Sequence, residues 1–205
     1  MKLYYSPGAC SLSPHIALHE ADIAFEAVLA STRTHKLLDG TDFHTINPKG
    51  YVPLLEFDDG TRLSEGPAIV QWIADQVPDR HLAPPANSMD RYRLQEWLTF
   101  IGTELHKQVS PLINPAMPDA AKAAFRQKFV ERLAYVDEHL ADRDYLLGAR
   151  FSVADGYLYT VARWATPLAL DISHLANLAS FMVRVGERPA VQRALHAEGL
   201  SAWAK

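Results

Sequence analysis

The sequence predicts an α/β domain at the N-terminus followed by an all-α domain. In the first 78 residues, short β-like runs alternate with helical patterns and include a hairpin signal. From residue 88 onward only helical periodicity is found. Residues 79–87 are rich in proline and polar residues, which is typical of a linker. We therefore expect domains at 1–78 and 88–205, with the boundary at 79–87.

Composition excludes several classes of partner. The 205 residues are 48% hydrophobic, enough for a substantial core. A net charge of -4 argues against nucleic acid or an anionic membrane surface as a partner. The sequence shows neither a signal-peptide pattern nor a run of about 18 apolar residues, so we expect a cytoplasmic protein.

The first elements follow the order of a thioredoxin-like fold. We expect a strand at 2–5, a turn at 6–8, a helix at 10–20, a strand at 25–29 and an irregular polar segment at 31–45. In the polar segment, His35 and Lys36 are either solvated or contact a ligand carboxylate.

The only cysteine, Cys10, opens the first predicted helix. A helix N-terminus can lower a thiol pKa and favour the nucleophilic thiolate, and Ser11 offers a hydroxyl beside it. The alternative is a small buried filler. His15 and His19 share one helix face, but with no evident third ligand we expect surface histidines and no metal site.

The chain around Val52-Pro53 predicts an extended edge. A proline at the first residue of a strand keeps the preceding residue extended, and Gly50 indicates a tight turn. Val52 can then pair its backbone with an extended peptide. The Gly-containing turn at 58–61 predicts a hairpin.

A helix start follows the hairpin. Pro67 suits the first helical position, which places Gly66 at the cap. The free N–H groups there favour a carboxylate, whereas the Glu65 side chain favours an ammonium group. A zwitterionic amino-acid head group would satisfy both, although an ordinary strand, turn and helix explains the same pattern.

The second half predicts helices at 89–107, 119–141, 152–164 and 173–187, and a short helical tail. The first of these helices has a core face formed by Leu94, Trp97, Leu98, Ile101 and Leu105. Thr99, Thr103 and His106 line up on its opposite side around Gly102, as either a solvated face or the wall of a site. Ser152 and Asp155 have the spacing of a helix cap, so we expect Asp155 to serve folding rather than chemistry.

Five linked motifs carry a resemblance that runs from end to end. They are PGACS at 7–11, NPKGYVP at 47–53, DDGTRLSEGPAI at 58–69, ELHK at 104–107 and SVADGYLYT at 152–160. In this order and spacing the chain resembles the beta-class bacterial glutathione S-transferases. The resemblance implies a thioredoxin-like domain followed by a helical bundle domain, glutathione as co-substrate in the cleft between them, and a homodimer.

The resemblance also implies roles for residues. The glutathione-binding positions would be Cys10, His35, Val52, Pro53, Glu65, Gly66, Thr99, Thr103, Glu104, Leu105 and His106. Val52, before a cis Pro53, would pair with the cysteinyl part, and Glu65 with Gly66 would hold the γ-glutamyl group. Cys10 and His106 would flank the sulfur as the catalytic residues. A second tier consists of Ser11, Lys36, Lys107, Arg163 and Trp164.

Two positions depart from the family pattern. His35 stands where the family often has lysine, and Gly66 lacks a hydroxyl that other members place there. We therefore expect modest glutathione affinity. The expected activity is conjugation of glutathione to hydrophobic electrophiles, as in detoxification. Alternatives are thiol–disulfide exchange through a Cys10 mixed disulfide and non-catalytic carriage of apolar ligands.

Overall fold

The computed structural model describes residues 1–203, which form two compact units. The first unit comprises Met1–Ala83 together with Arg188–Ala202, and the second comprises Pro84–Glu187 and Trp203. This architecture, a thioredoxin-like unit and a helical unit, is the fold class that the sequence predicts. Among residues 1–203, no helix combines the length and the apolar character needed to cross a membrane.

A four-stranded mixed sheet forms the centre of the first unit. Its strands are β1 (Lys2–Tyr5), β2 (Glu26–Leu29), β3 (Leu54–Glu56) and β4 (Arg62–Ser64), in the order β2-β1-β3-β4. β1 runs parallel to β2 and antiparallel to β3, and β3 pairs with β4 in the predicted hairpin. Leu3 lies opposite Leu55 in the register, and both side chains are fully buried.

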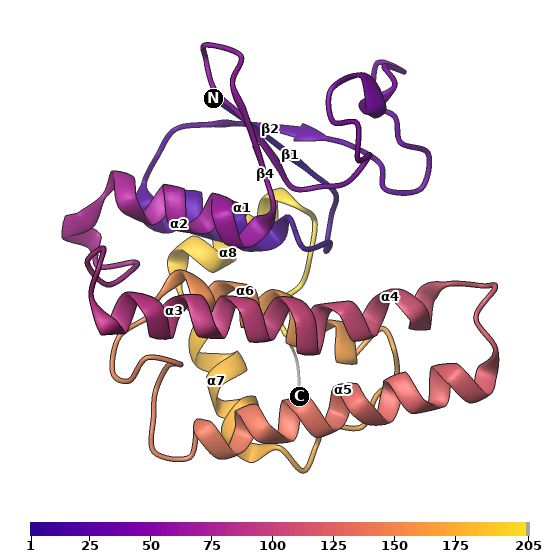
Figure 1. Cartoon of the computed structure of the whole chain (residues 1–205), viewed down its shortest axis with the longest axis vertical. Helices are drawn as coiled ribbons and strands as arrows, with labels where there is room; N and C mark the ends of the chain where they lie inside the picture. The colour runs from indigo at the N-terminus through magenta and orange to yellow at the C-terminus, as the bar shows by residue number, and fades with distance from the viewer. Residues whose placement is uncertain (204–205) are drawn as a thin grey trace. The chain divides into compact units, whose positions relative to one another are not determined.

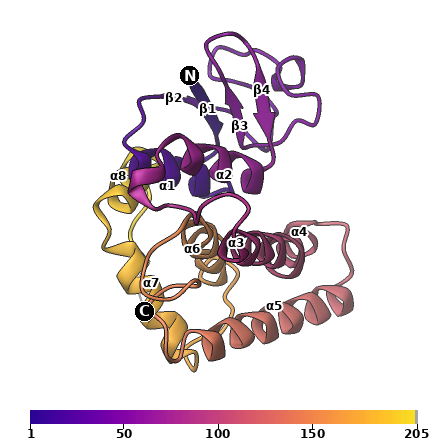
Figure 2. The same ribbon diagram turned by 60° about the vertical axis from the view of Figure 1, so that its left-hand side comes forward.

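Three α-helices complete this unit beside the sheet. They are α1 (Leu12–Ala21), α2 (Gly66–Gln76) and α8 (Pro189–Ala197), with short 3-10 helices η1 (Phe43–Thr45) and η2 (Pro78–Arg80). α1 packs between α2 and α8 below the sheet (Figure 2). Because α1 has neighbours on several sides, residues 12–18 are all buried, and no single apolar stripe marks it.

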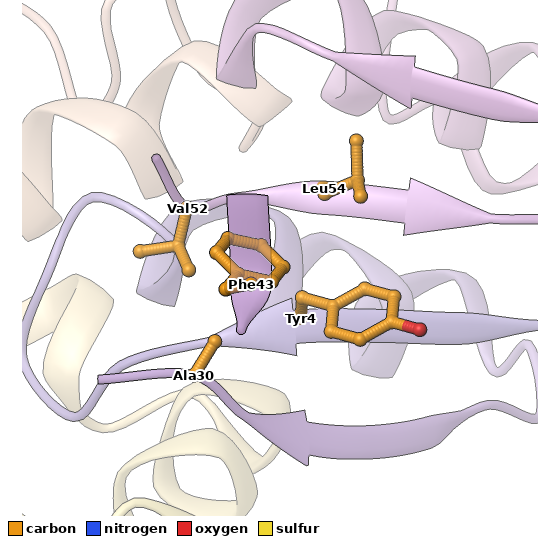
Figure 3. Close-up of a cluster of buried hydrophobic side chains, with 5 residues drawn as sticks. All are labelled: Tyr4, Ala30, Phe43, Val52 and Leu54. Atoms are coloured by element: carbon orange, nitrogen blue, oxygen red, sulfur yellow. The ribbon is translucent and has the colours of Figure 1, made fainter. Parts of the chain in front are cut away.

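The other face of the sheet carries a buried cluster of Tyr4, Ala30, Phe43, Val52 and Leu54 (Figure 3). Side chains alternate along a strand, so Tyr4 points away from the face that Leu3 occupies. The Phe43 ring lies 5.4 Å from the Tyr4 ring between centroids. The segment 31–45, predicted as irregular and polar, therefore supplies a buried side chain from η1.

The second unit is entirely helical. It contains α3 (Met89–Phe100), the π-helix η3 (Ile101–His106), α4 (Lys107–Ile113), α5 (Asp119–His139), α6 (Val153–Ala162), the 3-10 helix η4 (Arg163–Ala165) and α7 (Ala176–Gly186). α3, η3 and α4 follow one line, and α5 packs alongside α4 (Figure 1). α6 is buried along its whole length and contacts α3, η3 and α7.

The core face predicted for the helix after residue 89 is confirmed. Leu94, Trp97, Leu98, Ile101 and Leu105 are all buried. The single helix expected at 89–107 is wrong in detail, because it becomes a π-helix at Ile101 and then continues as α4 to Ile113. The core face nevertheless continues through the π-helix to Leu105.

The predicted cap of α6 is confirmed. Asp155 accepts hydrogen bonds from the Ser152 backbone N–H at 2.7 Å and from the Ser152 hydroxyl at 2.8 Å. Its other oxygen accepts from the Leu146 N–H at 2.8 Å. Burial raises the Asp155 pKa to about 6, although the N–H groups of Leu146 and Ser152 oppose that shift.

The C-terminal part of the expected helical domain, 88–205, belongs to the first unit instead. Arg188–Ala202 groups with the first unit because α8 packs against α1. Arg188 forms a two-bond ion pair with Glu20 on α1, at 2.6 and 2.9 Å. The chain enters the second unit at Pro84, inside the segment expected as a linker.

Candidate functional site

The only cysteine lies in a turn that leads into α1. The helix begins at Leu12, with Ser11 as its N-cap residue, so the predicted start at Cys10 is two residues early. The Cys10 thiol donates to the carbonyl oxygen of Val52, with the sulfur 3.3 Å away. The fold thus joins two residues that belong to separate sequence motifs.

The hydroxyl of Ser11 holds the cysteine turn closed. It accepts from the Ser6 backbone N–H at 3.1 Å and donates to the Ser6 carbonyl oxygen at 3.2 Å. Ser11 is fully buried. In the structure this hydroxyl therefore bonds to backbone rather than facing solvent beside the thiol.

Val52 is followed by a cis peptide bond to Pro53. Both residues are buried, and the Val52 side chain belongs to the apolar cluster on the second face of the sheet. A Cβ at Gly66 would lie 3.8 Å from Cγ of Pro53, so the start of α2 adjoins this proline. Cys10, Val52, Pro53 and Gly66 thus form one group within the first unit.

Glu65, rather than Gly66, is the N-cap residue of α2, and it holds a left-handed φ of 71°. Such a conformation is strained for a residue with a side chain. The Glu65 side chain is 69% exposed, and its Oε1 lies 2.6 Å from Nζ of Lys49. The carboxylate thus pairs with an ammonium group of the chain itself. Lys49 lies within the NPKGYVP motif but is not among the site residues predicted from the sequence.

His35 is tied to the turn that precedes Val52. Its Nδ1–H donates to the Gly50 carbonyl oxygen at 3.0 Å, and its ring lies 4.7 Å from that of His44. A Cβ on Gly50 would approach His44 Nε2 to 2.5 Å. A side chain at position 50 would therefore hold a strained backbone, with a φ of 65°, and would displace the His44 ring. Lys36 forms an isolated antiparallel β-bridge with Asp42. Nearby residues of the same segment therefore hold the backbone at His35 and Lys36.

Thr99, Thr103 and His106, predicted to share a polar face, make different contacts in the structure. The two threonine hydroxyls donate to backbone carbonyl oxygens one turn earlier, those of Gln95 and Thr99. His106 ends the π-helix and turns toward α6, where its Nδ1 lies 2.7 Å from the Tyr157 hydroxyl.

The imidazole of His106 is the centre of an aromatic group in the second unit. Its ring lies edge to face with Trp164 at 4.9 Å between centroids and with Tyr157 at 6.0 Å. Arg163 donates to the Tyr159 hydroxyl at 3.2 Å. Tyr157 is not among the site residues predicted from the sequence, although it lies within the SVADGYLYT motif.

Glu104, Leu105 and Lys107, the other candidates on this part of the second unit, lie in different surroundings. Glu104 pairs with Arg132 at 3.0 Å and with Lys128 at 3.8 Å, which directs its carboxylate toward α5. The Leu105 side chain is fully buried in the core, whereas Lys107 is exposed. The side chain of Leu105 thus serves packing, as its place on the core face predicts.

The expectation of two surface histidines on α1 is wrong for His15. Its side chain is 1% exposed, and Nδ1 lies 2.8 Å from Oε1 of Glu198. His19 stacks on His15 with ring centroids 5.2 Å apart. Across residues 1–203, no group of three or more His, Cys, Asp or Glu side chains is placed to hold a metal ion.

The fold and the first-unit group define a class of protein. A thioredoxin-like unit places a cysteine turn against the residue before a cis proline, and a helical unit follows along the chain. The class is that of proteins that join a thioredoxin-like unit to an all-helical unit.

Comparison with known proteins identifies the family within this class. Residues 8–76 match the glutathione S-transferase N-terminal domain, and residues 119–197 match the C-terminal domain. Glutathione S-transferase GstA of Escherichia coli O157:H7 is 49% identical over 200 residues, covering 98% of this chain and all of the relative.

Solved structures agree. A sphingomonad glutathione S-transferase complexed with glutathione has 48% identity and a TM-score of 0.93, covering 98% of this chain and 100% of that one. The beta-class enzyme of Sphingomonas chungbukensis has 46% identity and a TM-score of 0.94, with the same coverage. The chain belongs to the glutathione S-transferase family, in its bacterial beta class.

Proposed function

We propose that this protein conjugates the sulfur of glutathione to hydrophobic electrophiles. The observation that carries the proposal is the contact between the Cys10 thiol and the Val52 carbonyl, beside the cis proline, in a chain of this family. A relative of 48% identity has been solved with glutathione bound. Detoxification, a cytoplasmic location and a homodimer are proposed with it from the resemblance.

The first unit supplies groups that suit the peptide part of glutathione. The Val52 backbone pairs with the cysteinyl residue, as an added strand does. The exposed Glu65 carboxylate receives the γ-glutamyl ammonium group in place of Lys49. The N–H groups at the start of α2, beginning with Gly66, receive the γ-glutamyl carboxylate.

Chemistry requires that the glutathione thiol ionise near neutral pH. A free thiol has a pKa of about 8.5, so donors around the sulfur must favour the thiolate. We assign this role to Cys10 and to His106, whose ring is oriented by Tyr157. The thiolate then bonds to the electrophilic carbon, and the leaving group departs or, in an epoxide, the ring oxygen takes a proton.

Two rival activities use parts of the same site. In thiol–disulfide exchange, the Cys10 thiolate attacks a glutathione disulfide, forms a mixed disulfide and releases one glutathione thiolate. In a carrier, the protein binds apolar ligands without reaction. Family membership favours conjugation over both.

Calorimetric titration with glutathione and a conjugation assay with a panel of halogenated aromatics, epoxides and mixed disulfides test the proposal. Glu65→Gln removes one charge-assisted contact, worth about 1.5–3 kcal/mol, so we expect the glutathione Kd to rise at least tenfold. Glu56→Gln is the control, because Glu56 pairs with Arg62 on the neighbouring strand. Equal Kd values for the two variants, or no conjugation of any electrophile, would overturn the proposal.

A further inference from the structure

The carboxylate of Glu198, just beyond α8, contacts two segments near the N-terminus, the turn at Gly8 and the helix α1. Its Oε1 lies 2.8 Å from Nδ1 of His15, and its Oε2 accepts from the Gly8 backbone N–H at 2.9 Å. The side chains of His15 and Glu198 are 1% and 0% exposed. A carboxylate so buried is retained only where each oxygen has a partner, and here both do.

Gly8 lies in the turn that carries the cysteine. It has a left-handed φ of 71°, and a Cβ there would contact the Leu200 side chain at 3.8 Å. The segment after α8 therefore both bonds to the turn and covers it. Two residues later, Cys10 reaches the carbonyl oxygen of Val52.

We propose that Glu198 is a positioning residue for Cys10. Its carboxylate holds Gly8, and through the turn it sets the place of the thiol against Val52, while His15 holds the carboxylate from α1. The expected effect on conjugation rests on the proposed function. The positioning of the thiol itself does not depend on which reaction the protein catalyses.

The same two helices are joined at a second place, which provides a matched control. Arg188, just before α8, forms two hydrogen bonds with Glu20, near the C-terminal end of α1. The ten residues of α1 span about 15 Å, so this ion pair lies far from the Gly8 turn. Glu20→Ala thus weakens the attachment of α8 without removing the bond to Gly8.

A conservative variant separates geometry from charge. In Glu198→Gln, the amide oxygen can accept from the Gly8 N–H, and the amide NH2 can donate to His15 in its other tautomer. Glu198→Ala loses both contacts. Rescue by glutamine and not by alanine would mean that the hydrogen bonds, rather than the negative charge, position the turn.

The readout is alkylation of Cys10 by iodoacetamide, measured by intact mass. The thiolate displaces iodide, a thioether forms and the thiol proton passes to solvent. Because the chain has one cysteine, each mass addition of this kind reports that residue. All variants are compared at the same interval below their own melting temperatures.

We expect Glu198→Ala to alkylate at least threefold faster than wild type, because the thiol leaves its carbonyl partner. For conjugation we expect kcat/KM to fall at least fivefold, mainly through a higher KM for glutathione. Glu20→Ala should lower the melting temperature but change neither rate by more than twofold, and Glu198→Gln should resemble wild type. Unchanged alkylation in Glu198→Ala, or an equal change in Glu20→Ala, would overturn the inference.

Failure of the proposed function gives a different result. If wild-type protein neither binds nor conjugates glutathione, the function is wrong. The alkylation series still decides whether Glu198 positions Cys10, because iodoacetamide requires no glutathione site.

Discussion

The Nδ1 atom of His106 lies 2.7 Å from the hydroxyl oxygen of Tyr157, across 51 residues of sequence. His106 ends the π-helix η3, and a Cβ at Gly102, four residues earlier, would lie 3.7 Å from the same hydroxyl. The proposed catalytic histidine is therefore oriented by a partner that its own helix pattern does not reveal.

Tyr157→Phe tests that orientation. Loss of this hydrogen bond should lower the free energy of unfolding by about 1 kcal/mol. We expect kcat/KM for conjugation to fall about fivefold to tenfold because the imidazole loses its fixed position. Tyr135→Phe, at a tyrosine that is 51% exposed, is the control. Equal kcat/KM for wild type and Tyr157→Phe would show that the hydroxyl does not orient His106 for catalysis.

Gly66→Ser tests why modest glutathione affinity is expected. A Cβ at Gly66 meets only Pro53 Cγ, at an ordinary contact distance of 3.8 Å, and its φ lies outside the left-handed region. The added hydroxyl at the start of α2 should tighten glutathione binding about threefold to tenfold, the effect of one hydrogen bond. Gly66→Ala adds the carbon without the hydroxyl. A serine variant that binds no better than the alanine variant in calorimetry would refute the explanation.

Asp155 should make stability fall as pH rises from about 4 to about 6. Burial raises its pKa from 3.8 to about 6 in the folded protein, so the folded state holds the proton more tightly than the unfolded state. The contribution is complete well below pH 3.8 and is lost as pH rises through the folded pKa. A pKa difference of about 2 corresponds to about 3 kcal/mol.

Urea unfolding at pH 4 and pH 7 checks this prediction, with Asp155→Asn as the comparison. Other carboxylates also titrate, so the quantity of interest is the difference between the two proteins. Wild type should lose about 2 kcal/mol more than the variant over this interval. Parallel stability curves would show that Asp155 has the same pKa in both states.

His19 should act in the opposite direction on acidification. Burial, with added repulsion from His15 and Arg193, lowers the pKa of His19 from 6.5 to about 4. Its contribution to stability is then complete above pH 6.5 and is lost as pH falls toward 4. We expect His19→Asn to unfold at a lower pH than wild type, measured by circular dichroism. Coincident acid transitions would contradict the prediction.

Local pattern was sufficient wherever the determinant lies within a few residues. The hairpin after Pro53, the cap formed by Ser152 and Asp155, and the core face from Leu94 to Leu105 all depend on spacing along the chain. Turn chemistry, capping and helical periodicity are local properties, so the sequence predicts them directly. The linked motifs around Cys10 and Glu65 predicted the family in the same way.

Contacts between distant segments could not be read from the chain. The sequence shows two histidines on one helix, but it does not show that His15 is buried against the carboxylate of Glu198, 183 residues away. It shows Phe43 in a polar stretch, but the second face of the sheet requires an apolar cover.

The sequence by itself determined the two-part architecture, most of the helices and strands, and the family, because these follow from local periodicity and from motifs in a given order. Tertiary structure decided that α8 returns to the first unit, that His106 faces Tyr157, and that Glu198 reaches Gly8. The physical reason is that a buried polar group takes whichever partner folding brings within about 3 Å, and spacing along the chain does not specify that partner.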